Sequence, residues 1–400
     1  MQKTAPMHVL NQKNDVSWLL ILYVVLFPFA IGIVGPSFII SDVFLLGFIG
    51  VCLAKNLAKK SFQAISFDVL FLLLVAATLT GAGIATHLKA YLFELGSLVF
   101  MYLGARCIAA EISTADRLNS FVELVGKMFL IFLLFSFAVI VLRNCDFKEL
   151  TDYFFASGNR FKGIFNFTNQ LSIFLICLWP LAALSLRKSR SLRFVSYLAY
   201  LVCLSYIGSR SGFWIGITQT ALIEIFIPER KGSSILALNL ALLAAIVFLV
   251  ISFTASEVAM QRSLGDYGHG ALELDEARVN IFRQAFNVSE FWLFGYGLGC
   301  FDQNHRHEVH NTPFSILVET GLAGFVIASI FTLIFLYALF KTPDLAVLPK
   351  LHTALFISLA GMASVGMVIY LLRTRSCWLV FAIALAFIKI ERPSENVCNG

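Results

Sequence analysis

Long apolar segments alternate with short polar ones along most of the chain, and this pattern predicts helices that cross a membrane. The hydrocarbon core of a bilayer needs about 20 apolar residues per helix, and by that measure the chain contains about twelve spans. They are residues 17–34, 38–54, 67–86, 90–109, 121–142, 167–186, 192–207, 211–227, 235–253, 313–340, 351–372 and 376–390. We therefore predict an all-α, polytopic membrane protein with one integral membrane domain over residues 1–400.

Two polar stretches are too long to be simple connections. Residues 143–166 separate the fifth and sixth predicted spans, and residues 254–312 separate the ninth and tenth. We expect both to form partly helical loop regions on the same face of the membrane.

The basic residues predict the orientation, because short cytoplasmic loops carry an excess of Lys and Arg. If the N-terminus is cytoplasmic, 18 of the 30 basic residues fall on that side, among them those of the strongly basic loops KNLAKK and RKSRSLR. We therefore place both termini in the cytoplasm and both long loops on the exterior face. The first apolar segment is interpreted as a retained span rather than a signal peptide.

The composition agrees with a membrane protein. The chain is 59% hydrophobic and 14% charged, with a mean hydropathy of +0.83, whereas soluble domains have roughly 25% charged residues. The net charge of +6 is spread through the loops rather than gathered on one surface. We therefore expect membrane lipids, and not nucleic acid, among its partners.

The eight cysteines form no CxxC pair, and most lie inside apolar segments. Cys145 and Cys300 fall in the two predicted exterior loops, where an oxidising compartment would allow them to pair. The sequence does not place them within the distance that a disulfide needs, so this pairing stays open.

Arginines suited to phosphate binding occur in the longer loop. Arg278 and Arg283 belong to DEARVNIFRQAF, which resembles a short amphipathic helix. A planar guanidinium binds phosphate oxygens through two parallel hydrogen bonds, which suits a diphosphate. The alternative is pairing with Asp275 or Glu276 on a solvated surface, and it is stronger for Arg283.

Two further arginines lie near the predicted exterior ends of spans. Arg210 is in IGSRSGFW, between two spans, where a cation at membrane depth is costly and indicates a site. The alternative is an arginine that extends to lipid head groups. Arg160 and Lys162, in GNRFKGIFNFTNQ, add positive charge to the same face or anchor it to head groups.

Histidines are concentrated just before the tenth span, as His305, His307 and His310 beside Glu308. The spacing is not HExxH and no Cys or Asp set completes it, so we expect no metal. His310 is the strongest candidate, because the following Asn-Thr-Pro predicts a helix start at the membrane surface. Histidine titrates in a range that suits a general base near neutral pH.

Glu319, inside the same span, is an intramembrane carboxylate that needs a partner. The run GYGLG, with glycines at 295, 297 and 299, allows a tight turn. It is not a nucleotide-binding loop, since no strand precedes it and no Lys-Ser or Lys-Thr follows. We expect a loop that returns to the membrane and positions its neighbours.

Taken in the order in which they occur along the chain, these motif segments resemble the O-antigen ligase and O-antigen polymerase superfamily. The family shows an Arg-x-x-x-aromatic segment, a Gly-x-Gly-x-Gly-like turn, His-Asn, and a helix carrying Glu and Gly-Leu-x-Gly. The chain offers Arg278 with Phe282, then Gly295 to Gly299, His310-Asn311, Glu319 and Gly321 to Gly324, with Ser209-Arg210-Ser211-Gly212 upstream. It departs from the family at Phe282, where Trp is frequent, and at Thr312-Pro313, where an apolar residue is common.

The resemblance implies a GT-C-like membrane glycosyltransferase in a bacterial inner membrane, acting on its periplasmic face. The donor would be a glycan on undecaprenyl diphosphate, and the acceptor lipid A-core in a ligase or another lipid-linked glycan in a polymerase. By the resemblance His310 would be the base, and Arg210 and Arg278 would hold the diphosphate. The supporting candidates are Arg160, Arg283, His307, Asn311 and Glu319.

We expect neither metal nor cofactor, because guanidinium groups neutralise the diphosphate and the donor is already activated. No second carboxylate is placed to act as a nucleophile, so a single displacement with inversion is expected. The alternatives are a polymerase, a transporter that binds a lipid diphosphate with the same arginines, and a structural membrane component. The chain lacks the two similar halves that transporters usually show.

Overall fold

The computed structural model describes residues 16–29, 32–34, 38–59, 66–80, 87–156, 160–165, 167–186, 189–227, 233–254, 283, 293, 295–301, 311–342, 350–367, 371 and 374–391. Within these ranges the fold is all-helical, with 13 α-helices and two short antiparallel hairpins. The predicted fold class is confirmed at this level. Several long apolar helices identify a multi-pass membrane protein.

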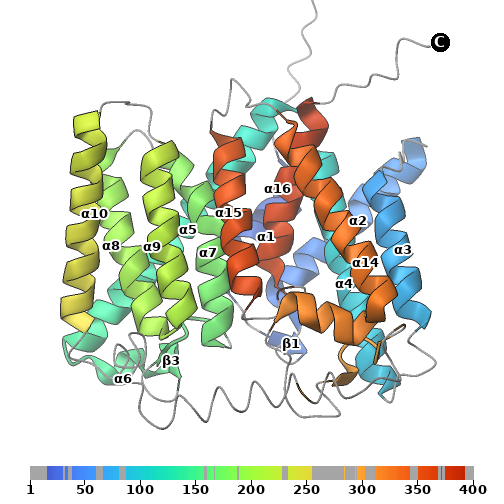
Figure 1. Ribbon diagram of the computed structural model, residues 1–400, viewed down its shortest axis with the longest axis horizontal. Helices are drawn as coiled ribbons and strands as arrows, with labels where there is room; N and C mark the ends of the chain where they lie inside the picture. Colours follow the sequence, from blue (N-terminus) through green and yellow to red (C-terminus); the bar gives the residue numbers. More distant parts are fainter. Residues whose placement is uncertain are drawn as a thin grey trace, which may run out of the picture.

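The helices run up and down a bundle (Figure 1). They are α1 Trp18–Leu26, α2 Ile40–Lys59, α3 Ser66–Thr80, α4 Leu88–Glu111, α5 Ala115–Asn144, α6 Lys148–Thr151, α7 Thr168–Ser185, α8 Arg190–Ile207, α9 Arg210–Phe226, α10 Ser233–Thr254, α14 Thr312–Phe340, α15 Leu351–Gly366 and α16 Arg375–Glu391. A 3₁₀ helix, η3, covers Asp152–Phe154. Strand β1 (Gly32–Val34) pairs with β2 (Phe38–Ile39), and β3 (Phe155–Ala156) with β4 (Arg160–Phe161).

The predicted number of spans is wrong. Each predicted span overlaps a helix, but in the described part of the chain five helices are long and apolar enough to cross a bilayer: α2, α4, α5, α7 and α14. Others are too short. Helix α1 has 9 residues, because Pro28 and the first hairpin follow directly, and α3 and α15 have 15 and 16. The apolar pattern extends past helix ends into hairpins and turns, so it overestimates helix length.

Helix α14 is bent rather than continuous. Gly321 has φ 68° and ψ −176°, which breaks the helix after its ninth residue. Residues 312–320 lie across the lower end of the bundle and residues 322–340 run upward (Figure 1). At 1.5 Å per residue the second half is about 28 Å long, enough for a bilayer core of about 30 Å. The predicted span 313–340 therefore combines two helical pieces.

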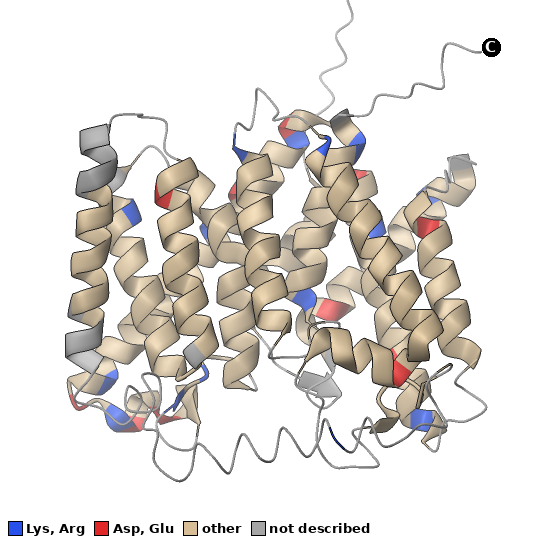
Figure 2. Cartoon of the chain, in the orientation of Figure 1, with Lys and Arg blue, Asp and Glu red and all other residues tan. Residues whose placement is uncertain are grey.

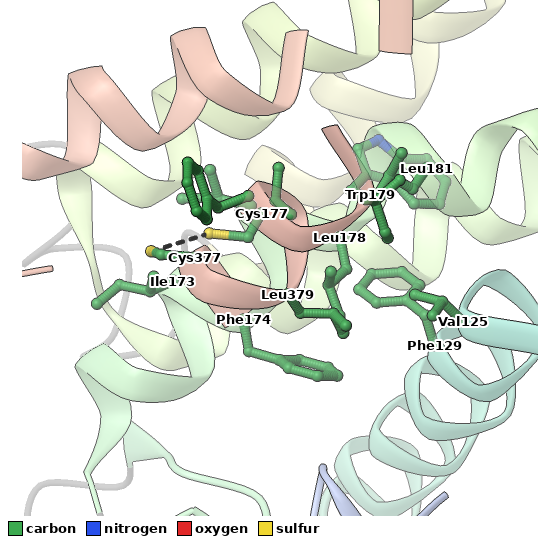
Figure 3. Close-up of a cluster of buried hydrophobic side chains, with 14 of the residues drawn as sticks. Val125, Phe129, Ile173, Phe174, Cys177, Leu178, Trp179, Leu181, Cys377 and Leu379 are labelled. Atoms are coloured by element: carbon green, nitrogen blue, oxygen red, sulfur yellow. Dashed lines mark hydrogen bonds between the residues drawn. The ribbon is translucent and has the colours of Figure 1, made fainter. Parts of the chain in front are cut away.

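Helix α7 is the centre of the core. It packs against α5, α8, α9, α15 and α16, and all its residues from Leu171 to Leu184 are buried. Figure 3 shows the place where it meets α5 and α16, with Phe129 packed against both Phe174 and Trp179 and with Cys177 facing Cys377. The Trp179 ring also stacks on Tyr200 of α8 at 4.7 Å between centroids. Aromatic packing of this kind joins helices without relying on polar groups.

Charged side chains gather toward the ends of the helices, with few in between (Figure 2). Three ion pairs join helices away from the surface, where a low-dielectric interior favours paired charges. Arg106 of α4 binds Asp68 of α3 at 2.7 Å, and Arg193 of α8 binds Glu224 of α9 at 2.6 Å. Arg375 of α16 donates from Nε to Asp42 of α2 at 2.8 Å.

Candidate functional site

The α8–α9 turn carries Arg210 as the first residue of α9. Gly208 ends α8 in the left-handed conformation, at φ 68°, and the Ser209 hydroxyl accepts a hydrogen bond from the Gly212 N–H at 3.2 Å. This cap satisfies a donor of the first helical turn. The backbone of Arg210 therefore stands at a helix N-terminus, where the helix dipole favours an anion. Its side chain lies outside the described residues.

Arg160 packs against this turn from the shorter loop. Its Nε–H donates to the Ile207 carbonyl oxygen at 2.9 Å. A Cβ on Gly208 would lie 3.3 Å from the same nitrogen, so the close approach favours a glycine there. Two sequence-predicted segments, one with Arg160 and one with Arg210, thus meet at the lower end of the bundle, where β3 lies (Figure 1).

The predicted helix start after His310 is confirmed. Asn311 caps α14, accepting at Oδ1 from the Phe314 N–H at 2.9 Å, and Pro313 lies in the first turn. The same amide donates from Nδ2 to the Met367 carbonyl at 3.0 Å, and the Leu371 N–H donates to the Thr312 hydroxyl at 2.9 Å. The start of α14 is therefore fastened to the connection between α15 and α16.

The GYGLG run forms a loop that docks on the break of α14. We call the described residues 293 and 295–301 the glycine loop. The N–H of Tyr296 donates to the Val318 carbonyl at 2.9 Å, and that of Gly297 donates to the Glu319 carbonyl at 3.0 Å. Gly295, Gly297 and Gly299 have φ values of 71°, 88° and 70°, which L-residues rarely adopt. The loop thus satisfies carbonyls that a broken helix leaves without partners.

Two glycines meet where the loop touches the break. A Cβ on Gly295 would lie 2.5 Å from the Glu319 carbonyl oxygen and from the Gly321 nitrogen. A Cβ on Gly321 would lie 2.4 Å from the Leu293 carbonyl oxygen. Both distances are shorter than any real contact and involve backbone atoms, so only glycine fits at either position. We call this contact the glycine junction.

Glu319 is buried at the break, with 3% of its surface exposed. The sequence placed it inside one continuous span, whereas it lies in the first half of α14, two residues before Gly321. Its backbone carbonyl holds the glycine loop.

The open question of a disulfide is settled for the two loop cysteines. Cys145 and Cys300 are both free, the first exposed and the second buried. Burial raises the pKa of the Cys300 thiol, and its Sγ lies 3.8 Å from the His87 carbonyl. Cys300 therefore packs the loop against the start of α4 rather than forming a cross-link.

The remaining candidates are placed only in part. Arg278, His307 and His310 lie outside the described residues, and Arg283 is described as exposed. Convergence of Arg210, Arg278 and His310 stays a prediction. Among described residues, no group of three or more His, Cys, Asp or Glu side chains could hold a metal ion.

No protein-family model matches the chain, and no curated protein matches it. The resemblance to the ligase and polymerase superfamily therefore depends on the motif residues and on where they lie.

Sequence reasoning missed two features of this site. The break at Gly321 was hidden because Gly321-Leu-Ala-Gly324 was interpreted only as a family motif inside an apolar span. The polar Glu-Thr-Gly run at its centre was the available signal. The contact of Thr312 with Leu371 had no signal, because it joins residues 59 positions apart.

Proposed function

We propose that this protein is a membrane glycosyltransferase. It moves a glycan from undecaprenyl diphosphate to a hydroxyl acceptor on the periplasmic face, with ligation of O-antigen to lipid A-core as the leading form. One observation carries the proposal: the described segments with family-like motifs, which are the α8–α9 turn, the glycine loop and the start of α14, lie at the same end of the bundle (Figure 1). Arg160 packs beside the turn that leads into Arg210, and the glycine loop and Asn311 hold the two ends of the first half of α14.

The proposal includes a GT-C-like arrangement in a bacterial inner membrane, with both termini cytoplasmic. It is supported by the basic end of α2, at Lys55 and Lys59, and by Arg193 and Lys389 near the start of α8 and the end of α16. These positions are at helix ends opposite the glycine loop and the α8–α9 turn (Figure 1). The positive-inside rule associates basic helix ends with the cytoplasm, and a site at the opposite ends of these helices would then be periplasmic.

In the proposed reaction the acceptor hydroxyl oxygen attacks the anomeric carbon of the donor. His310 takes the hydroxyl proton, a new carbon–oxygen bond forms, and the bond to undecaprenyl diphosphate breaks. The electron pair of that bond leaves with the diphosphate, whose new negative charge Arg210 and Arg278 neutralise. These contacts strengthen as charge develops, so they lower the barrier rather than only binding the donor. Attack opposite the leaving group inverts the anomeric configuration.

The position of Arg210 suits this role. The first turn of α9 presents backbone N–H groups and the positive end of the helix dipole beside the arginine. A phosphate there would receive hydrogen bonds from the helix start as well as from the guanidinium. Such sites bind anions without a metal ion.

The decisive test is transfer by the purified protein in liposomes that contain an undecaprenyl diphosphate glycan and lipid A-core. We expect a glycan–lipid A-core product with inverted anomeric configuration and release of undecaprenyl diphosphate. A product with the original configuration would overturn the single displacement. Movement of the donor across the bilayer without any product would instead identify a transporter.

A polymerase is the second candidate, because the same motif order occurs in both branches of the superfamily. The lipopolysaccharide of a deletion strain distinguishes them on one gel. Loss of a ligase leaves complete polymer on the lipid carrier and none on core. Loss of a polymerase leaves single repeat units on core.

A further inference from the structure

The longer loop is held at an internal point, and not only at its two ends. The glycine loop lies between Arg283 and Asn311, and the junction attaches it to the break of α14. The junction therefore fixes one described point of the longer loop on α14.

The far end of the glycine loop is also anchored. Phe301 is fully buried and packs with Val318 of α14 in a small second core, beside Tyr296. The rings of Tyr296 and Phe301 meet edge to face at 5.6 Å between centroids. With Cys300 against the His87 carbonyl, the loop contacts both α14 and the start of α4. The loop is thus mounted on two helices.

The first half of α14 is fixed at both ends in turn. Asn311 and Thr312 tie its start to the α15–α16 connection, and the glycine junction ties its end. A short helix held at two points keeps a constant distance between them, because its backbone hydrogen bonds resist bending.

We propose that the glycine junction, Gly295 against Gly321, is a positioning device for the transfer reaction. It fixes the end of the first half of α14 against the glycine loop, and the start of the same half, at Asn311, follows His310 directly in the chain. This inference rests on the proposed function. Neither glycine contacts substrate; they act by placing groups that do, and a displacement of about 1 Å is enough to slow a reaction by about 100-fold.

The first test replaces each glycine by alanine. The new methyl group must displace the loop, because it meets backbone atoms at 2.4–2.5 Å. We expect kcat for transfer to fall at least about tenfold in Gly295→Ala and in Gly321→Ala, while KM for the donor changes less than about twofold. Gly50→Ala and Gly96→Ala are matched controls, because nothing lies within 4 Å of either added methyl group. Both controls should transfer normally.

The second test links the loop to the helix covalently. Leu293 and Leu322 have side chains that are 56% and 47% exposed on the two sides of the junction. In a background with Cys145→Ser and Cys398→Ser, Leu293→Cys with Leu322→Cys should cross-link through a short bis-methanethiosulfonate, each thiol displacing one sulfinate. Leu293→Cys with Ile330→Cys, about 12 Å further along α14, is the control pair and should not.

The cross-link distinguishes positioning from mere stability. With native glycines, the linked protein should keep kcat within about twofold, because the link repeats a contact already present. In Gly295→Ala the same link should restore at least half of the lost kcat. Rates are compared at equal amounts of folded protein, so a gain in stability alone would not raise kcat. Loss of transfer on linking the native-glycine protein would overturn the proposal, since the junction would then have to open. So would alanine variants that lose the cross-link and transfer at the native rate.

The failure of the proposed function has a different signature. The native protein could join no donor to acceptor while residues 293 and 322 still cross-link as expected. That result would overturn the proposed function and the role of the junction in transfer, and the contact would then be purely structural. The native-glycine measurement decides the inference even where an alanine variant does not fold.

Discussion

Two polar side chains at the candidate site, Arg160 and Asn311, form hydrogen bonds with backbone groups and so stabilise the local backbone conformation. Arg160 donates its Nε–H to the Ile207 carbonyl, and Asn311 both caps α14 and donates to the Met367 carbonyl. Both were expected from sequence as supporting residues, Arg160 for its positive charge in the shorter loop and Asn311 as part of the His-Asn motif. Their partners are carbonyl oxygens of distant helix ends, which no local pattern reveals. A supporting residue of this kind acts by fixing where its neighbour stands.

His310 is the residue on which transfer should depend most. We expect His310→Ala to lower the transfer rate by about 10²–10⁴-fold, the usual contribution of a general base, with the protein still folded and inserted. His305→Ala, in the same HRHEVH run, is the matched control and should retain activity. The measurement is the initial rate of product formation in liposomes. Equal rates for the two variants would remove His310 from the mechanism.

Arg160 should matter through the turn that it supports. Removing the charged donor from the Ile207 carbonyl loosens the α8–α9 turn by about 1–2 kcal/mol, and Arg210 begins α9 two residues after Gly208. We expect Arg160→Ala to reduce kcat about tenfold, whereas Lys162→Ala in the same loop changes it little. Steady-state kinetics in liposomes compares the two. If both variants behave alike and only membrane association changes, Arg160 is a head-group anchor.

At the scale of elements, the sequence predicted where most helices are but not how they end or bend. The Asn-Thr-Pro start of α14 was predictable because capping is local: its signal lies within four residues. The break at Gly321 was not, because it depends on contact with the glycine loop more than twenty residues earlier. Hydropathy averages over such a contact and returns one long span. The same averaging merged α1 with the hairpin that follows it.

The Asn311 side chain makes two hydrogen bonds, one that caps α14 and one to Met367, and two substitutions distinguish them. Asn311→Asp keeps an acceptor for the Phe314 N–H and loses the donor to Met367, whereas Asn311→Ala loses both. We expect the alanine variant to be less stable by about 1–2 kcal/mol, because it loses both the cap and the hydrogen bond to Met367, and the aspartate variant to lose less because it keeps the cap. Both should transfer more slowly, because both release the tether to Met367. Thermal unfolding in detergent and transfer rates report the two effects separately. An aspartate variant with native activity would show that the tether is dispensable.

At the scale of the whole molecule, helices far apart in sequence are joined by polar contacts inside an apolar bundle. Asp42 at the start of α2 is 1% exposed, caps the Ile39 N–H at 2.9 Å and binds Arg375 at the start of α16. This pair joins positions 333 residues apart and connects α2 to α16 directly. Nothing in the sequence connects an aspartate in ISDVF with an arginine in RTRSC, because each reads as an ordinary residue at a span end.

The pair should therefore behave as a buried ion pair rather than as a surface one. Asp42→Asn or Arg375→Gln alone leaves a buried charge without its partner and should cost about 3–5 kcal/mol, whereas the double variant should cost less than the sum because no unpaired charge remains. Glu123 and Lys127 of α5, an i,i+4 pair at 3.6 Å whose side chains are at least half exposed, provide the matched control. Such a pair is worth at most about 1 kcal/mol, so Glu123→Gln should change stability little. Thermal unfolding in one detergent compares all four variants. If the effects of the two buried substitutions simply add, the contact between α2 and α16 is not an energetic link, and the bundle is closed by apolar packing around α7 alone.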